Sequence, residues 1–340
     1  MKAVGYKESL PITDANTLVD FELPQPVVGG YDMLVRIDAI AVNPVDYKVR
    51  QTMPPAGGAY RILGWDASGE VVAAGNQVSQ FQPGDKVFYA GDITLPGSNA
   101  EYQRVDARLA GHRPRSLSAA EAAALPLAAI TAWEILFDHL KLSRVNGNRD
   151  GAPTLLVTGA AGGVGSMLVQ LARRLTNATV VATASRPQSR DWVTALGAHH
   201  VIDHHGDMVA QLRALGIDQV NHVASLNGTG RHFATLVEVL KPFGSLVLID
   251  DPVELDIGKL KSKSLSLHWE FMFARSMHRA DDMQTQGELL SRIALLVDDG
   301  LIKTTLGQNL GTINAANLRR AHTLLEAGDT IGKIVLEGFD

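Results

Sequence analysis

Residues 154–165, TLLVTGAAGGVG, decide the fold of this chain. A run of apolar strand-forming residues passes directly into a glycine-rich turn, and an amphipathic helix is expected over residues 164–175. Strand, tight turn and helix in this order are typical of a dinucleotide-binding unit. Glycines leave room for a pyrophosphate to approach the backbone, and a helix N-terminus offers N–H groups and a positive dipole end. We therefore predict cofactor contacts at Gly162, Gly163 and Val164.

Downstream of this unit, strand-like and helix-like segments alternate. The further strands are expected at residues 179–185, 199–203, 220–225 and 245–250. Consecutive parallel strands need crossover connections, which helices usually supply. The alternation therefore predicts a doubly wound α/β domain, with a parallel sheet covered by helices on both faces.

The first 110 residues differ, because short apolar runs alternate there with Gly and Pro. This pattern predicts an antiparallel, barrel-like β domain. A polar link at residues 146–150 is expected to precede the α/β domain. Helices are expected at residues 288–297 and 315–327, in a tail that we expect to return to the first domain. The predicted boundaries are 1–128, 129–272 and 273–340.

Composition excludes several classes of protein. The chain has 340 residues, a net charge of −5 and no cysteine. Such a charge offers no basic face for nucleic acid, and the lack of cysteine excludes disulfides and thiolate metal sites. Residues 1–12 lack the apolar run of a signal peptide, and two glutamates and a proline interrupt the apolar stretch 119–137. We expect a cytoplasmic protein without a membrane segment.

The end of the second strand of the α/β domain selects the cofactor. An Asp or Glu there would bind the ribose 2′-hydroxyl of NAD and repel a 2′-phosphate. This chain instead has Ser185 and Arg186, with Arg190 nearby. Hydroxyl and guanidinium donors match a phosphate, which favours NADPH. The competing interpretation is that these arginines are ordinary solvated residues at the start of a helix.

At this point the chain resembles the medium-chain dehydrogenase/reductase superfamily, in particular its zinc-free quinone oxidoreductase branch, which is often labelled zinc-type alcohol dehydrogenase-like. The motifs span nearly the full length: AVNPVDYK (41–48), GWDASGEV (64–71), PGDKV (83–87), GAAGGVG (159–165) and GKIVL (332–336). The resemblance implies a chaperonin-10-like catalytic domain made of both chain ends around a central Rossmann domain. It also implies that Thr131, His204 and Lys333 contact the cofactor, with His204 at the adenine end.

The same comparison argues against a metal. Zinc-dependent relatives have a Cys where this chain has Asn43 and a His where it has Trp65. Neither replacement supplies the thiolate or imidazole that tetrahedral zinc needs. The histidines at 199–205 lack the helical spacing and the acidic partner of a metallohydrolase site. We therefore predict no metal.

Hydride transfer needs a positioned acceptor more than it needs a nucleophile. Asn43 is a candidate to hydrogen-bond the acceptor oxygen, and Lys48 to stabilise the negative charge that develops there. Asp46 is a third catalytic candidate, with capping of the local turn as its alternative. The side chains expected to line the acceptor pocket are Trp65, Trp269 and Phe271. Core packing is the alternative for the aromatic run after residue 268.

Ser225 and Asn227 follow a strand of the parallel sheet, at the carboxyl edge where nicotinamide ligands bind, and are predicted cofactor contacts. The predicted function is NADPH-dependent hydride transfer to a small-molecule quinone or α,β-unsaturated carbonyl acceptor. Two alternatives stay open: a zinc-containing alcohol dehydrogenase with unfamiliar ligands, and a non-enzymatic NADPH-binding redox sensor. We also expect a homodimer or tetramer that pairs through an edge strand at residues 245–250.

Exchanging Arg186 for Asp is expected to reverse the cofactor preference. The change removes a guanidinium donor and places a negative charge beside the 2′-phosphate, while the new carboxylate still accepts from the 2′-hydroxyl of NADH. A charge-assisted hydrogen bond contributes roughly 1.5–3 kcal/mol, so NADPH should bind about ten- to a hundred-fold more weakly. Steady-state kcat/KM with both nucleotides measures the change. A ratio within about two-fold of the wild-type value would dismiss Arg186 and make Arg190 the next candidate.

Overall fold

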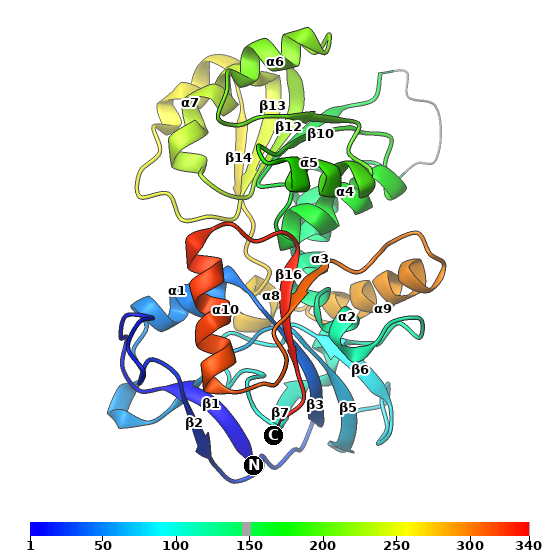
Figure 1. Cartoon of the computed structure of the whole chain (residues 1–340). Coiled ribbons are helices and arrows are strands. Elements are labelled where there is room, and N and C mark those ends of the chain that lie inside the picture. The colour runs from blue at the N-terminus through cyan, green and yellow to red at the C-terminus, as the bar shows by residue number, and fades with distance from the viewer. Residues whose placement is uncertain (145–150, 340) are drawn as a thin grey trace. The chain divides into compact units, whose positions relative to one another are not determined.

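The computed structural model describes residues 1–144 and 151–339, and the chain divides into two compact units (Figure 1). Unit 1 comprises Met1–Ile130 and Phe273–Asp340, and unit 2 comprises Thr131–Met272. The polar link predicted at residues 146–150 lies outside the described residues. Both ends of the chain belong to unit 1.

Unit 2 is built on one parallel sheet of six strands in the order β11-β10-β9-β12-β13-β14. The strands are β9 (Thr154–Thr158), β10 (Thr179–Thr183), β11 (His200–Ile202), β12 (Val220–Ser225), β13 (Leu240–Leu248) and β14 (Ser266–Trp269). In chain order this is 3-2-1-4-5-6, the doubly wound arrangement whose switch point lies between the first and fourth strands. The predicted α/β fold is thus confirmed.

Helices connect these strands and cover the sheet (Figure 1). They are α4 (Gly163–Leu175), α5 (Pro187–Ala195), α6 (Met208–Ala214), α7 (Thr229–Val239) and the 3-10 segment Ile257–Lys263. Val181, Val223 and Leu246, on three different strands, are fully buried in one core cluster. Such burial is what the continuous apolar runs of a parallel sheet require.

The edge of this sheet is not the strand that the sequence suggested. Residues 245–250 were the expected edge, but β13 lies between β12 and β14, and the two edge strands of the sheet are β11 and β14. Ser266 and Trp269 of β14 are exposed. Because an edge strand is only half covered, β14 lacks the apolar run by which the inner strands were found. The expectation of a homo-oligomer stays a prediction, and its contact through residues 245–250 is wrong.

Unit 1 is mainly antiparallel. Its small sheet has the order β2-β1-β4, and its large sheet has the order β15-β16-β3-β5-β6-β8, with β7 paired to β3. The strands are β1 (Lys2–Tyr6), β2 (Val19–Glu22), β3 (Asp32–Val42), β4 (Arg61–Ile62), β5 (Ala67–Ala74), β6 (Lys86–Tyr89), β7 (Tyr102–Asp106), β8 (Ala110–His112), β15 (Leu306–Asn309) and β16 (Lys333–Glu337). Strand β16 pairs with β3, with Ile334 opposite Val42, so the last strand of the chain joins a sheet begun near its start.

The helices of unit 1 are short except near the end of the chain. They are α1 (Pro44–Thr52), α2 (Ala119–Ala123), α8 (Ala274–Met277), α9 (Thr285–Asp298), α10 (Ala315–Ala327) and the 3-10 turns Ala56–Gly58 and Ala107–Leu109. The sequence placed α10 at its observed bounds and α9 three residues too short at its start. The segment α3 (Pro126–Trp133) and the π-helical turn Glu134–His139 carry the chain from unit 1 into unit 2.

A buried arginine fastens α1 to α10. Arg50 is fully buried; its Nε donates to His322 Nδ1 at 3.3 Å, and its guanidinium pairs with Glu326. It also donates to the Leu10 carbonyl at 2.6 Å. Burial, followed by the nearby arginine charge, lowers the pKa of His322 to about 3. The neutral imidazole therefore accepts from Arg50, and Arg50 ties α1 to two segments distant in the sequence, α10 and the segment at Leu10.

The apolar stretch of the chain is core material. Among the described residues, Ala119–His139 is long and apolar enough to cross a membrane by length and composition, although its glutamates and proline led us to exclude this. Of its most apolar 18 residues, 89% are buried inside the structure. Packing within the protein therefore accounts for the apolar character of this stretch without a membrane.

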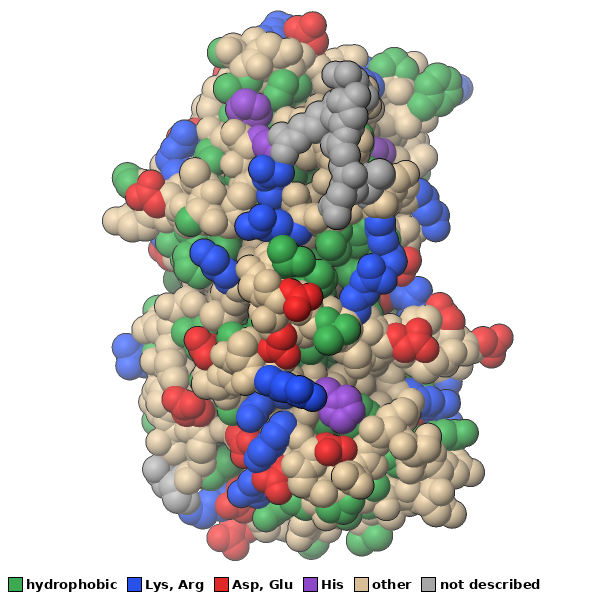
Figure 2. All heavy atoms as spheres, turned by 90° about the vertical axis from the view of Figure 1, so that its right-hand side faces the viewer, with side chains coloured by type: hydrophobic (Ala, Val, Ile, Leu, Met, Phe, Trp, Pro, Cys, Tyr) green, Lys and Arg blue, Asp and Glu red, His purple; other side chains and the backbone are tan. Residues whose placement is uncertain are grey.

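The surface carries charges of both signs. On the face drawn in Figure 2, Lys and Arg side chains of unit 1 lie beside Asp and Glu rather than forming a continuous basic patch. Arg36 and Lys86, for example, each pair with Glu70 at 2.7 Å. The expectation that nucleic acid is not a partner stays a prediction.

Candidate active site and nucleotide site

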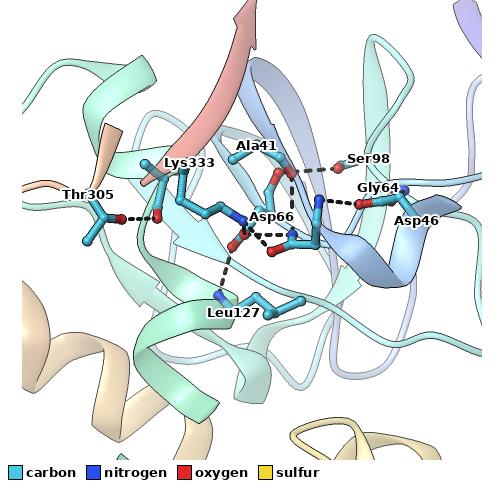
Figure 3. Close-up of polar contacts among 10 residues, drawn as sticks. Ala41, Asp46, Gly64, Asp66, Ser98, Leu127, Thr305 and Lys333 are labelled. Atoms are coloured by element: carbon cyan, nitrogen blue, oxygen red, sulfur yellow. Dashed lines mark hydrogen bonds and ion pairs between the residues drawn. The ribbon is translucent and has the colours of Figure 1, made fainter. Parts of the chain in front are cut away.

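A buried polar cluster joins three segments of unit 1 (Figure 3). Asn43 follows β3 and is the N-cap residue of α1, Asp66 precedes β5, and Lys333 begins β16. Their exposed fractions are 2%, 0% and 4%. Polar side chains buried to this degree have to satisfy one another, because water does not reach them.

The cluster is fully interlocked. Lys333 Nζ donates to Asp66 Oδ2 at 2.8 Å and to Asn43 Oδ1, while Asn43 Nδ2 donates to Asp66 Oδ2 at 2.9 Å. The backbone N–H of Leu127 donates to Asp66 Oδ1 at 2.7 Å. Burial raises the pKa of Asp66, and the Lys333 charge and these hydrogen bonds oppose that rise. The ion pair and the amide thus hold each other in a single arrangement.

Asp46 holds the backbone beside this cluster. Its Oδ2 accepts from the N–H of Asn43 at 2.7 Å, and its Oδ1 accepts from the N–H of Gly64 at 2.9 Å. Burial raises the pKa of Asp46 to about 7. These contacts match the capping alternative for Asp46. Gly64 has a φ of +109°, and a Cβ there would lie 2.5 Å from Ser98 Oγ, so only glycine fits this close approach.

The other candidates near the cluster lie in different surroundings. Lys48 is half-buried on α1, and it is Lys333 that contacts Asn43. Trp65 is 1% exposed, packs edge-on against Phe273 at 6.0 Å and donates to a backbone carbonyl. The structure therefore buries Trp65 in the core of unit 1.

The predicted aromatic wall belongs to unit 2. Trp269 is 56% exposed and Phe271 is 47% exposed. The core-packing alternative does not describe these two side chains, because half of each is open. Their role toward an acceptor stays a prediction.

A catalytic zinc does not fit the cluster. Tetrahedral zinc in proteins is held by thiolate, imidazole and carboxylate donors. Asn43 and Trp65 offer neither thiolate nor imidazole, and the Lys333 ammonium places a positive charge against the Asp66 carboxylate. Across residues 1–144 and 151–339, no group of three or more His, Cys, Asp or Glu side chains is arranged to hold a metal ion.

The glycine-rich turn of unit 2 fits a pyrophosphate. It joins β9 to α4, whose N-cap residue, Gly162, has no side chain with which to cap the helix. A Cβ on Gly165 would lie 2.5 Å from Ala160 Cα, so glycine permits close packing of helix and turn. A Cβ on Gly162 would meet only Gly159 O, at 3.4 Å. The first N–H groups of α4, with Gly163 and Val164, therefore face space that an anion can use.

The structure separates the two arginine candidates for a 2′-phosphate. Arg190 donates to the carbonyls of Ala184 and Val201, both at 3.1 Å, and so ties together the ends of β10 and β11. Ser185 and Arg186 follow β10 after Ala184 and are half-buried. Arg190 therefore has a structural role, and Arg186 is the better placed candidate.

The remaining predicted contacts of unit 2 lie on several different elements. His204 lies 4.3 Å from His205 between ring centroids, and burial lowers the pKa of His204, which suits a neutral ring stacked on adenine. Thr131 is buried in α3. Ser225 ends β12, and Asn227 lies in the loop between β12 and α7.

Sequence reasoning missed Asp66 as a site residue and gave Lys333 only as a cofactor contact. In the structure Lys333 belongs to unit 1 and pairs with Asp66. A charged residue at the head of the apolar run KIVL was the signal that could have marked Lys333 as a buried partner.

Two family models match the chain: an alcohol dehydrogenase GroES-like domain over residues 29–117 and a zinc-binding dehydrogenase over residues 196–336. A zinc-type alcohol dehydrogenase-like protein of Staphylococcus aureus is 38% identical over 99% of both chains. The 2-methylene-furan-3-one reductase of Solanum lycopersicum is 31% identical over 92% of this chain and 73% of its own.

Solved structures are similar over the whole chain. A Rhizobium etli protein named for the zinc-dependent alcohol dehydrogenases is 50% identical, with a TM-score of 0.95 over 100% of this chain and 98% of that chain. A mycobacterial protein solved with NADPH is 26% identical, with a TM-score of 0.84 over 99% of this chain and 100% of that chain.

Replacing Lys333 by Met is expected to destabilise unit 1, because Asp66 would stay buried without its counter-charge. Removing one partner of a buried ion pair costs about 3–5 kcal/mol. Adding Asp66→Asn to Lys333→Met removes the orphaned charge and should recover most of that loss. Thermal unfolding of the wild type, both single variants and the double variant measures the coupling, with the exposed Lys259→Met as control. Equal melting temperatures for Lys333→Met and the double variant would contradict the ion pair.

Proposed function

The chain belongs to the medium-chain dehydrogenase/reductase superfamily, and on that basis we propose that it is an NADPH-dependent reductase that works without catalytic zinc. Its acceptor would be a quinone or an α,β-unsaturated carbonyl compound. The observation that carries this proposal is the buried cluster of Asn43, Asp66 and Lys333, in which the lysine ammonium pairs with the carboxylate.

Metal-free chemistry restricts the range of reactions. Zinc in a dehydrogenase acts as a Lewis acid on an alcohol or carbonyl oxygen. Without it, simple alcohols lack the activation that their oxidation needs. Quinones and enones accept hydride more readily, because their conjugated systems delocalise the negative charge that arrives. The cluster therefore favours the reduction of such acceptors over the oxidation of simple alcohols.

Unit 2 is proposed to bind the cofactor, which supplies the hydride when bound. The N-terminus of α4 would hold the pyrophosphate at Gly162, Gly163 and Val164, and Arg186 would pair with the 2′-phosphate. The NADPH bound to the mycobacterial relative supports this choice of nucleotide. Positioning by these groups contributes to catalysis by holding the donor in one orientation.

Unit 1 is proposed to supply the electrostatic help. Lys48 would stabilise the negative charge on the acceptor oxygen. Asn43 is engaged through both its Oδ1 and its Nδ2 within the cluster, which favours a supporting role over a direct hydrogen bond to the acceptor. The enone reductase named among the relatives supports an unsaturated carbonyl compound as one acceptor class.

The names of several relatives favour a second candidate, a zinc-containing alcohol dehydrogenase. The donor set of this chain argues against it, because the residues at the two zinc-ligand positions are Asn43 and Trp65. A non-enzymatic NADPH-binding protein would require the same nucleotide site but no turnover. Assays with several acceptors separate these candidates.

Purified protein with NADPH is expected to reduce at least one quinone or enal in a panel that also contains simple ketones, and to use NADH less well. NADPH oxidation followed by absorbance measures the rates. Gly162→Val is the matched negative control: Gly162 has a φ of −73°, which valine adopts without strain, and its side chain would occupy the space proposed for the pyrophosphate.

Two results would contradict the proposal. Oxidation of simple alcohols with no turnover of any quinone or enone would favour the zinc dehydrogenase. Tight NADPH binding without turnover of any acceptor would favour the non-enzymatic alternative.

A further inference from the structure

A network of hydrogen-bonded, buried hydroxyl groups crosses the carboxyl edge of the sheet in unit 2. Thr158 ends β9 and Ser225 ends β12, and the two residues lie opposite each other in the parallel pair. Thr229 begins α7, and Asp250 follows β13. The three hydroxyl residues are 2%, 0% and 0% exposed. Of these four residues, the sequence analysis predicted a role at the site only for Ser225.

The carboxylate of Asp250 decides which hydroxyl groups of this network donate and which accept. Thr229 donates its N–H to Asp250 Oδ2 at 2.8 Å and its hydroxyl to Asp250 Oδ1. Because the single hydroxyl hydrogen of Thr229 is used in this way, Ser225 has to donate in the 2.7 Å contact between the two hydroxyls. Thr158 in turn lies 3.4 Å from Ser225 Oγ and accepts the N–H of Leu226 at 3.2 Å.

Asp250 also replaces a missing helix cap. The N-cap residue of α7 is Gly228, which has a φ of +70° and no side chain with which to cap the helix. A carboxylate at a helix N-terminus is favourable both as a hydrogen-bond acceptor and against the helix dipole. Asp250, which follows the next strand, therefore supplies the acceptor that Gly228 lacks, and through Thr229 it also contacts Ser225 at the other end of the loop 225–228.

This loop lies beside the glycine-rich turn. A Cβ built on Gly159 would lie 3.4 Å from Asn227 Cβ and 3.5 Å from Leu226 Cβ. The strand order places β9 and β12 on the two sides of the switch point, where a dinucleotide binds in this fold. With the 2′-phosphate proposed at the end of β10, on one side of β9, the other half of the cofactor extends toward β12.

We propose that Asp250 is a positioning residue for the nicotinamide half of the cofactor, acting through Thr229 and Ser225 on the loop 225–228. This inference rests on the proposed NADPH-dependent function. Asp250 does not contact the cofactor in this scheme. It holds the loop in one conformation before the cofactor binds, which lowers the ordering cost of binding.

Thr229→Val tests the hydroxyl network with little change in shape, because it removes the hydroxyl and keeps a branched side chain. Thr229→Ser keeps the hydroxyl. Thr235→Val makes the same Thr-to-Val exchange elsewhere on α7, at a residue that is not part of the hydroxyl network. Calorimetry measures the Kd of each variant for NADPH and for 2′-phospho-ADP-ribose, which lacks the nicotinamide. Asp250→Asn, which turns one acceptor into a donor, is measured in the same way and covers the case in which Thr229→Val does not fold.

For Thr229→Val and Asp250→Asn the Kd for NADPH should rise about ten-fold, and the Kd for the truncated nucleotide should stay within about two-fold of wild type. Thr229→Ser and Thr235→Val should bind both ligands like the wild type. Equal weakening of both ligands, or of neither, would overturn the positioning role while leaving the proposed function intact. A wild-type protein that binds neither ligand would overturn the proposed function, and this inference with it.

Discussion

The ion pair between Lys333 and Asp66 is the constraint on which unit 1 depends. Two opposite charges buried to 4% and 0% exposure are tolerable only when their remaining hydrogen-bonding capacity is satisfied. Asn43 and the N–H of Leu127 satisfy it, and this requirement draws the end of β3, the start of α3 and the start of β16 to one point. The pairing of β16 with β3 brings Lys333 there, so both ends of the chain serve one cluster.

The sequence predicted those features that depend on neighbouring residues. The run at 154–165 indicated the strand, turn and helix at the centre of unit 2, and periodicity placed α10 at its observed bounds. The apolar pattern did not indicate β14, because this edge strand, with Ser266 and Trp269 exposed, contains no continuous apolar run. The same weakness led to the wrong choice of residues 245–250 as the edge.

The polar networks were beyond sequence reasoning for a different reason. Asn43, Asp66 and Lys333 are far apart along the chain, and Asp250 lies 21 residues from Thr229, so only the folded sheets bring them together. Arg190 looked like a phosphate ligand by position, yet its guanidinium is held by two backbone carbonyls. Residue type and spacing predicted the class of site, and packing decided which side chains are committed to structure.

Zinc content tests most directly whether the Lys333–Asp66 pair has taken the place of a catalytic metal. Protein expressed in zinc-supplemented medium and purified without chelator is analysed by mass spectrometry of the metal, and NADPH-dependent turnover is followed before and after dialysis against a chelator. Far less than stoichiometric zinc, with turnover unchanged by the chelator, is the expected result. Stoichiometric zinc that is lost together with activity would contradict the replacement of the metal by lysine.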